Sequence, residues 1–204
     1  MSEISIDADL FWAAKELFVY PEEERLNQNR QNMLNLVQFT EGSDLTDIIE
    51  FKNLLKSGYF ELEKLEVDFT RLFINGVPTA KAHPFAGWYM GDEIVFGESD
   101  RSILNFYAAY GLNYDLSQSI PADHILVELE FIAVMLEEYE KSRQGLYLKA
   151  VEEFIDGHVT KWVPFFAKEI RNHAETVFYR GAAMIVENLF NRVLKEIKGR
   201  EIDG

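Results

Sequence analysis

Residues 125–139, ILVELEFIAVMLEEY, carry the clearest secondary-structure signal in the chain. The apolar residues that repeat there at intervals of three or four are Ile125, Leu129, Ile132, Leu136 and Tyr139. In an α-helix this spacing forms one stripe, whereas Glu130, Glu137 and Glu138 fall on the other side. The segment therefore predicts a helix packed against a core, with Pro121 in its first turn.

Similar spacing extends over most of the chain, while Gly and Pro are concentrated in a few places. The pattern predicts a single all-α domain of about eight or nine helices. We expect N-terminal helices over residues 1–75, a loop over 76–98 and C-terminal helices over 99–204. The loop is rich in Gly, Pro and aromatic residues, and a connection of this length is often functional, so it is a candidate contact surface.

The composition narrows the possible functions. The 204 residues include no Cys, which excludes disulfides, thiolate metal sites and cysteine nucleophiles. The 35 Asp and Glu exceed the 20 Lys and Arg by 15. This negative charge repels phosphate backbones and anionic lipids, so we expect no nucleic-acid partner and favour a basic one.

Charged residues interrupt every apolar run, so the sequence predicts no membrane insertion. Residues 1–9, MSEISIDAD, carry acidic residues where a secretory signal carries Lys or Arg. We therefore expect a cytoplasmic protein.

Common catalytic motifs, including His-Glu-x-x-His, Gly-x-Ser-x-Gly and the phosphate-binding Gly-x-x-x-x-Gly-Lys, do not occur. His124 and Glu128 are one helical turn apart, a spacing that allows them to share a proton or a metal ion and equally suits a buried hydrogen-bonded pair. Asp123 lies in the predicted first turn, where a carboxylate is favoured by the helix dipole. We predict no catalytic residue, metal or cofactor; the alternatives are a metal-assisted hydrolase using these three residues and a generic helical adaptor.

The segment Pro121-Ala-Asp123-His124, with the helix after it, resembles the Pro-x-Asp-His signature of the TorD/DmsD/NarJ chaperones. Further segments resemble the same family in the same order. They are Asp68-Phe-Thr-Arg71-Leu72-Phe73 followed by Gly76 and Pro78, Pro84-Phe85-Ala-Gly87-Trp88-Tyr89, Val95-Phe96-Gly97-Glu98, Phe106-Tyr107, Tyr110-Gly111-Leu112, Phe154-x3-His158-x3-Trp162-Val163-Pro164-x-Phe166, and Phe178-Tyr179. Two departures are Phe85, where the family commonly has Tyr, and Gly87, where Ser is common.

The resemblance implies an all-helical cytoplasmic chaperone, and not an enzyme. Members of this family bind an apo molybdoenzyme catalytic subunit, often through its twin-arginine signal peptide, until cofactor insertion is complete. The family also implies a monomer or a swapped homodimer. Weak guanine-nucleotide binding has been proposed for some members, but no phosphate-binding loop supports it in this sequence.

A twin-arginine leader joins a cationic segment to an apolar one, so its receptor needs acidic groups beside an apolar groove. We expect Asp123, His124 and Glu128 to form the polar end of the site. The aromatic residues that we expect on the apolar side are Phe73, Phe85, Trp88 and Tyr89.

Overall fold

The computed structural model describes residues 7–40, 46–76, 79–92, 95–115 and 120–201, and within them the fold is all-α, as the sequence predicts. These residues form ten α-helices and no β-strand. The helices are α1 (Ala8–Glu16), α2 (Glu23–Leu36), α3 (Thr46–Ser57), α4 (Leu62–Phe69), α5 (Ala86–Met90), α6 (Glu98–Ala109), α7 (Ile125–Ser142), α8 (Gly145–Gly157), α9 (Val163–His173) and α10 (Val177–Glu201). A 3-10 turn follows α2, a π-helical turn extends α4 to Ile74, and a second 3-10 turn precedes α9.

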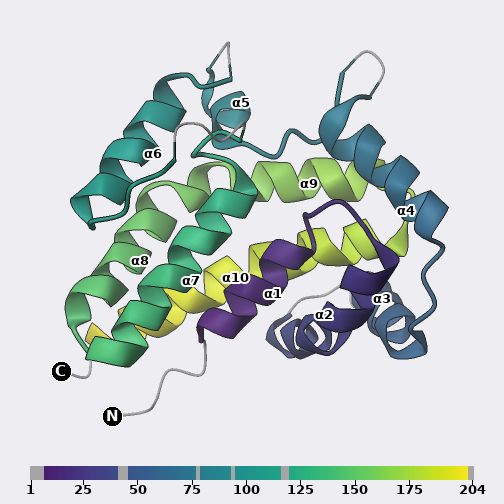
Figure 1. The fold of residues 1–204 in the computed structure, drawn as a ribbon, viewed down its shortest axis with the longest axis horizontal. Helices are drawn as coiled ribbons and strands as arrows, with labels where there is room; N and C mark the ends of the chain where they lie inside the picture. Colours follow the sequence, from purple (N-terminus) through teal and green to yellow (C-terminus); the bar gives the residue numbers. More distant parts are fainter. Residues whose placement is uncertain (1–6, 41–45, 77–78, 93–94, 116–119, 202–204) are drawn as a thin grey trace.

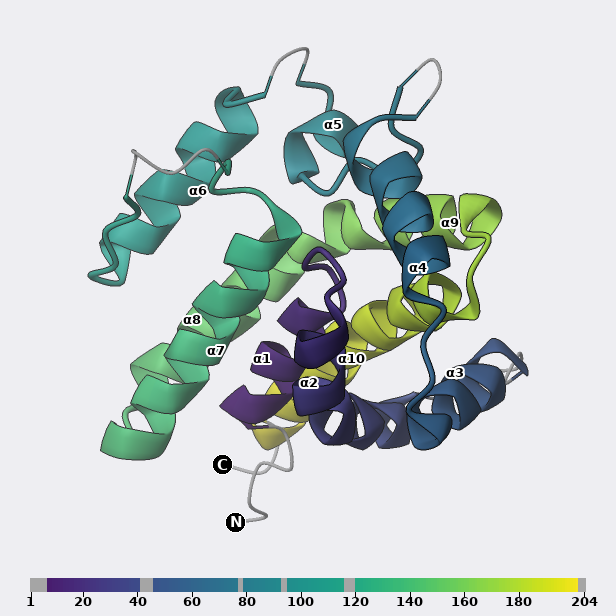
Figure 2. The ribbon, with the colours of Figure 1, turned by 45° about the vertical axis from the view of Figure 1, so that its right-hand side comes forward.

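The long helix α10 links the two halves of the structure, because it contacts α9, α8, α3 and α1. Helix α1 lies in the middle of the view, against α7 on one side and α2 on the other (Figure 1). Turning the molecule separates α6, α7 and α8 on one side from α3 and α4 on the other, with α1, α2 and α10 between them (Figure 2). Sequence-distant helices therefore share one interior.

Aromatic side chains fill the centre of this interior. The Phe73 ring lies 5.5 Å from that of Tyr179 and 6.0 Å from that of Phe166, measured between centroids. Phe18, at the end of the first helical segment, contacts the Phe73 and Phe166 rings as well. Edge-on and tilted ring pairs of this kind stabilise a core beyond the area that they bury. Residues from the N-terminal and C-terminal halves thus meet in one cluster.

A second aromatic group joins α6 to α7 and α8. The Tyr107 ring stacks on that of Phe131 with 4.6 Å between centroids, and Phe154 lies 4.8 Å from Phe131. Phe106 contacts the Phe131 and Phe154 rings from the same helix as Tyr107. This group fixes α6 beside the start of α7, where the Pro-x-Asp-His segment lies.

Asp68 joins the end of α4 to the turn between α9 and α10. Its buried carboxylate accepts hydrogen bonds from the backbone N–H groups of Glu175 and Thr176, at 3.0 and 2.8 Å, and from the Thr176 hydroxyl. Arg71 donates to the same carboxylate at 2.7 Å and to the His173 carbonyl oxygen. The acidic group satisfies backbone donors just before α10 begins, as a capping side chain does within one helix.

Two predicted features differ from the structure. The expected loop over residues 76–98 contains the helix α5, although residues 77–78 and 93–94 lie outside the described part. The helix expected from Pro121 begins only at Ile125, because His124 has an extended backbone and caps it. None of the helices in the described ranges has the length and apolar character needed to cross a membrane.

Candidate functional site

The Pro-x-Asp-His segment holds helix α5 in place. The Asp123 Oδ2 atom accepts a hydrogen bond from the Gly87 N–H at 2.8 Å, and the Asp123 carbonyl oxygen accepts one from Ala86 at 3.0 Å. The Ile125 N–H donates in turn to the Pro84 carbonyl oxygen at 2.8 Å. Asp123 therefore supplies the N-terminal cap that the five-residue helix α5 lacks in its own sequence.

Gly87 is the residue that allows this close approach. A Cβ atom at position 87 would lie 2.8 Å from the Asp92 carboxylate and 3.2 Å from the Asp123 carboxylate. The first distance is shorter than a normal non-bonded contact, so a larger residue requires Asp92 to shift. The two carboxylates pack so tightly here that Gly, and not the Ser that is common in the family, fits without a shift.

The Asp123 segment is itself fixed by α6. The Asp100 carboxylate accepts a hydrogen bond from the Ala122 N–H at 2.6 Å, and the Tyr107 hydroxyl donates to the Ala122 carbonyl oxygen at 3.1 Å. Burial raises the pKa of Asp123, although the hydrogen bond from Gly87 partly opposes this effect. Only 3% of Asp123 is exposed, so its carboxylate orients the backbone and is not available to a partner in this conformation.

His124 is the N-cap of α7, because its Nδ1 atom accepts a hydrogen bond from the Leu126 N–H at 3.1 Å. Burial lowers its pKa to about 4, so the imidazole is neutral at neutral pH. A neutral ring is also what the cap requires, since Nδ1 must keep its lone pair to accept. His124 and Glu128 therefore do not share a proton or a metal ion, because the Glu128 carboxylate binds His158 and Trp162 instead.

Glu128 on α7 is fully buried and contacts two residues at the turn after α8, His158 and Trp162. Its Oε1 atom is 2.6 Å from His158 Nε2, and its Oε2 atom accepts a hydrogen bond from Trp162 Nε1 at 3.1 Å. Burial raises the pKa of Glu128 and His158 opposes that change. Burial also lowers the pKa of His158, but the Glu128 carboxylate outweighs it and the net shift is upward.

His158 and Trp162 are the members of this cluster that the site prediction missed. Their spacing of four residues is that of one helical turn, and the segment that contains them is one of those that resemble the family. Nothing in that local pattern points to Glu128, because the contact depends on how α7 and α8 pack. Asp123, His124 and Glu128 therefore do not converge on one point, and the described residues contain no group of three His, Asp or Glu that could hold a metal ion.

The aromatic residues of the predicted site divide into exposed and buried ones. Trp88 is 52% exposed and stacks on His83 with 3.6 Å between ring centroids. Phe85 is half-buried and contacts the His83 ring from its edge. Tyr89 is half-buried under α5 and stacks on Trp162, 5.9 Å away between centroids, while burial raises its pKa. Phe73 belongs to the central core and is only 8% exposed.

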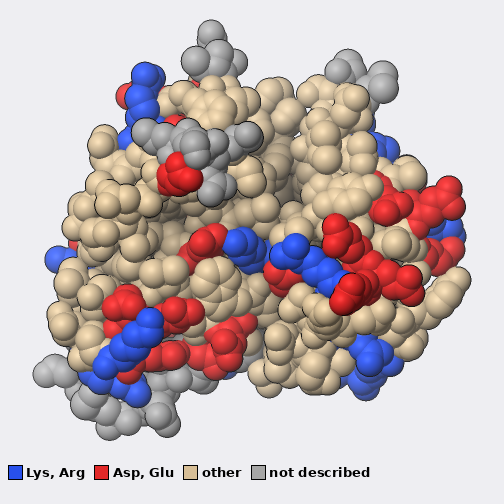
Figure 3. Space-filling view, in the orientation of Figure 1, with Lys and Arg blue, Asp and Glu red and all other residues tan. Residues whose placement is uncertain are grey.

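The surface around α5 differs in charge from the rest of the face shown in Figure 3. Charged side chains gather over the lower half of that view, whereas few lie around α5 and the upper end of α4 (Figure 3). Exposed apolar side chains on α5 and on α9, against which α5 packs, are Trp88, Met90 and Phe165. This arrangement can bind an apolar segment but shows no catalytic geometry.

Comparison with known proteins identifies the family. The family model described as nitrate reductase delta subunit matches residues 42–168. A curated protein named chaperone protein TorD, from Vibrio cholerae serotype O1 strain ATCC 39541, is 24% identical over 190 residues, covering 87% of this chain and 86% of the relative. A perchlorate reductase assembly chaperone protein from Dechloromonas aromatica is 25% identical over 138 residues, covering 64% and 62% of the two chains.

The fold is also found among solved structures. A putative redox enzyme maturation protein from Archaeoglobus fulgidus superposes with a TM-score of 0.62 at 23% identity, covering 92% of this chain and 96% of the other. The matched residues of the family model extend over more than half of the chain and include Asp68, Trp88 and the Pro-x-Asp-His segment. The chain therefore belongs to the nitrate reductase delta subunit family, and the resemblance of its motifs to the TorD/DmsD/NarJ chaperones is confirmed.

Proposed function

We propose that this protein is a redox-enzyme maturation chaperone that works in the cytoplasm. It binds an apo molybdoenzyme catalytic subunit through its twin-arginine leader, at the surface around α5, and releases it when cofactor insertion is complete. The observation that carries the proposal is that Asp123 of the Pro-x-Asp-His segment holds α5, the helix on which Trp88 is exposed. The family motif thus supports an exposed aromatic side chain and not a reactive centre.

The apolar half of the leader is assigned to Trp88, Met90 and Phe85. Trp88 and Met90 are 52% and 43% exposed, and large aromatic anchors commonly dominate the binding of peptide segments. Tyr89 and Phe73 lie beneath this surface, and the rings of both contact the Phe166 ring on α9. They are proposed to support the site from within.

The cationic half of the leader requires acidic groups at the surface. Glu169 on α9 is half-buried, lies 3.4 Å from His173 Nδ1, and is close enough to Tyr89 to contribute to raising its pKa. The net charge of −15 attracts a cationic leader at longer range, an effect that salt screens. Asp123, His124 and Glu128 are proposed as positioning residues. The first two accept hydrogen bonds from backbone N–H groups, and the third binds two buried side chains of the core.

The test is a titration of a synthetic peptide, with two adjacent arginines followed by an apolar segment, against wild type and the Trp88→Ala variant. Trp88→Ala is expected to weaken binding by about 1–3 kcal/mol at both low and high ionic strength, because the lost contact is apolar. Glu169→Gln is expected to weaken binding at low ionic strength and less at high ionic strength.

The matched control is Leu146→Ala on α8, where a side chain 51% exposed is removed far along the sequence from α5. Its peptide affinity is expected to equal that of the wild type. Equal affinities for wild type and Trp88→Ala, with both proteins folded, would show that the leader does not bind at α5. A peptide with glutamates in place of the arginines tests the charge requirement independently.

A further inference from the structure

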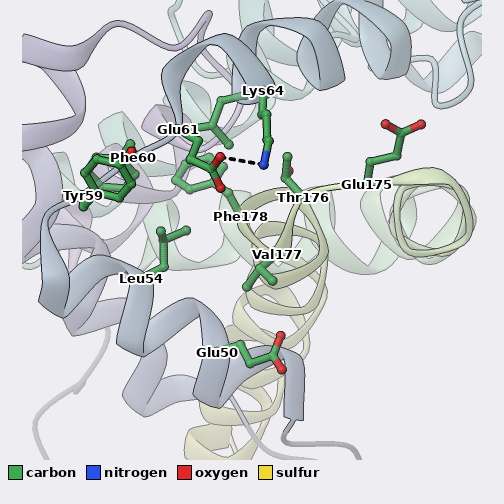
Figure 4. A pocket seen from close by; sticks show the side chains of 11 residues that line it. Glu50, Leu54, Tyr59, Phe60, Glu61, Lys64, Glu175, Thr176, Val177 and Phe178 are labelled. Atoms are coloured by element: carbon green, nitrogen blue, oxygen red, sulfur yellow. Dashed lines mark ion pairs between the residues drawn. The ribbon is translucent and has the colours of Figure 1, made fainter.

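A groove on another part of the surface has no role in the proposed function. It lies between α3, the start of α4 and the start of α10, and has a volume of about 310 Å³ (Figure 4). The residues that line it are Glu50, Leu54, Tyr59, Phe60, Glu61, Lys64, Leu65, Glu175, Thr176, Val177 and Phe178. None of them belongs to the surface around α5.

The floor of the groove is apolar and well supported. Leu65 and Phe178 are buried, and the Phe60 ring meets that of Phe178 edge-on with 6.4 Å between centroids. Leu54 from α3 and Val177 from α10 face the space between their helices (Figure 4). Tyr59 stands at the side and is 72% exposed, the largest exposure of any large apolar side chain in the described residues.

The rim of the groove is acidic. Its charged residues are three carboxylates, Glu50, Glu61 and Glu175, against the single ammonium of Lys64. Lys64 pairs with Glu61 at 2.5 Å, and Glu175 lies 3.4 Å from Arg71. Glu50 forms no ion pair with any residue in the described ranges.

The N-terminus of α10 lies at the same groove, but it does not make the groove favourable for an anion. The N–H groups of Glu175 and Thr176 already donate to the Asp68 carboxylate. An anion would therefore find these backbone donors occupied and the rim carboxylates repulsive. A cation at the rim meets the carboxylate of Glu50, which has no ion pair within the part of the chain that the structure describes.

We propose that this groove is a second peptide-binding site, which takes one large apolar side chain of a partner protein whose neighbouring residues are Arg or Lys. Its volume is at the lower end of ligand pockets, which are roughly 300–1,000 Å³, so it suits one or two side chains and not a whole folded surface. The apolar side chain enters between Tyr59 and Val177, and the flanking cation pairs with Glu50. Such a site gives a client a second contact, and two weak contacts bind together more tightly than either alone.

The experiment measures fluorescence anisotropy of a dansyl-labelled hexapeptide, Arg-Leu-Arg-Phe-Leu-Arg. It is carried out with the Trp88→Ala variant, so that the α5 surface does not contribute, and repeated with wild type. Tyr59→Ala is expected to weaken binding about 5–10-fold at low and high ionic strength, as loss of an apolar anchor does. Glu50→Gln is expected to weaken it about 3-fold at low ionic strength and less at high ionic strength.

The controls match these variants in exposure and type. Glu63→Gln removes an exposed carboxylate of α4 outside the groove, and Val67→Ala removes an apolar side chain of α4 that is 58% exposed. Both are expected to leave the affinity unchanged. Equal affinity of Tyr59→Ala and Val67→Ala, or equal binding of a hexapeptide with Glu in place of Arg, would overturn the proposal. Because Trp88→Ala is the background, this result is independent of the test at α5.

Discussion

Asp123 and Gly87 are joined by a hydrogen bond of 2.8 Å between the buried carboxylate and the backbone N–H, across 36 positions of the sequence. This bond attaches the start of α7 to the short helix α5. It explains why an acidic residue of the family's motif is almost completely buried. The carboxylate acts as a structural cap, whereas the binding surface that we propose uses the exposed Trp88 of α5.

Replacement of Asp123 tests this attachment. Asp123→Ala leaves the Gly87 N–H without its acceptor, and we expect the free energy of unfolding to fall by about 1–3 kcal/mol. Asp123→Asn keeps an oxygen acceptor and should recover part of this loss. Urea denaturation followed by circular dichroism measures both variants. Unchanged stability in Asp123→Ala would mean that the hydrogen bond contributes nothing to the fold.

His124 makes stability depend on pH. Its folded pKa of about 4 is below the ordinary value of 6.5, so between these values the unfolded state binds more protons. The contribution of the neutral ring to the free energy of unfolding is complete above pH 6.5 and is lost as the pH falls toward 4. For the pKa difference of about 2.5 units, partly reduced by solvent, this loss is about 2–3 kcal/mol.

The matched variant is His124→Asn, because Asn is an effective N-cap and does not titrate. As the pH falls from 6.5 to 4, the unfolding free energy of the wild type should decrease relative to that of His124→Asn. Other titrating groups act in both proteins and largely cancel in this difference. A difference that is constant over this pH range would contradict the burial of a neutral His124.

The Glu128 carboxylate controls the protonation of His158. Glu128→Gln removes the negative charge 2.6 Å from the imidazole but keeps an oxygen that can accept from Trp162. We expect the His158 pKa to fall, because burial alone lowers it and the carboxylate that raises it is absent. Titration of the His158 ring signals by NMR in wild type and Glu128→Gln measures this pKa. A His158 pKa equal in both proteins would exclude the pairing.

Two glycines of α10 should respond differently to replacement by Ala. A Cβ atom at Gly181 would lie 2.5 Å from the Phe51 ring, whereas one at Gly199 would meet nothing within 4 Å. Gly181→Ala should therefore destabilise the protein by about 1–3 kcal/mol through overpacking. Gly199→Ala should be neutral or stabilising by up to about 1 kcal/mol, because Ala favours helices. Thermal unfolding compares them, and a stabilised Gly181→Ala would contradict the close packing of α3 on α10.

Local sequence patterns predicted most of the fold correctly. The 125–139 stripe depends on residues three or four positions apart, a range over which short-range rules apply. The family motifs correctly pointed to a chaperone, since they are also local in sequence. Whether the predicted residues contact a leader remains a prediction.

The sequence by itself determined most of the helices, the acidic charge and the family, because these depend on residue type and short spacings. Tertiary structure alone decided that α7 begins only at Ile125, after a turn whose Ala122 backbone is held by Asp100 and Tyr107. It also decided that Glu128 pairs with His158 and not with His124, since a buried carboxylate takes its partner from the helix packed against it. Helix α5 could not be predicted, because five residues do not form a stable helix alone and its cap comes from Asp123.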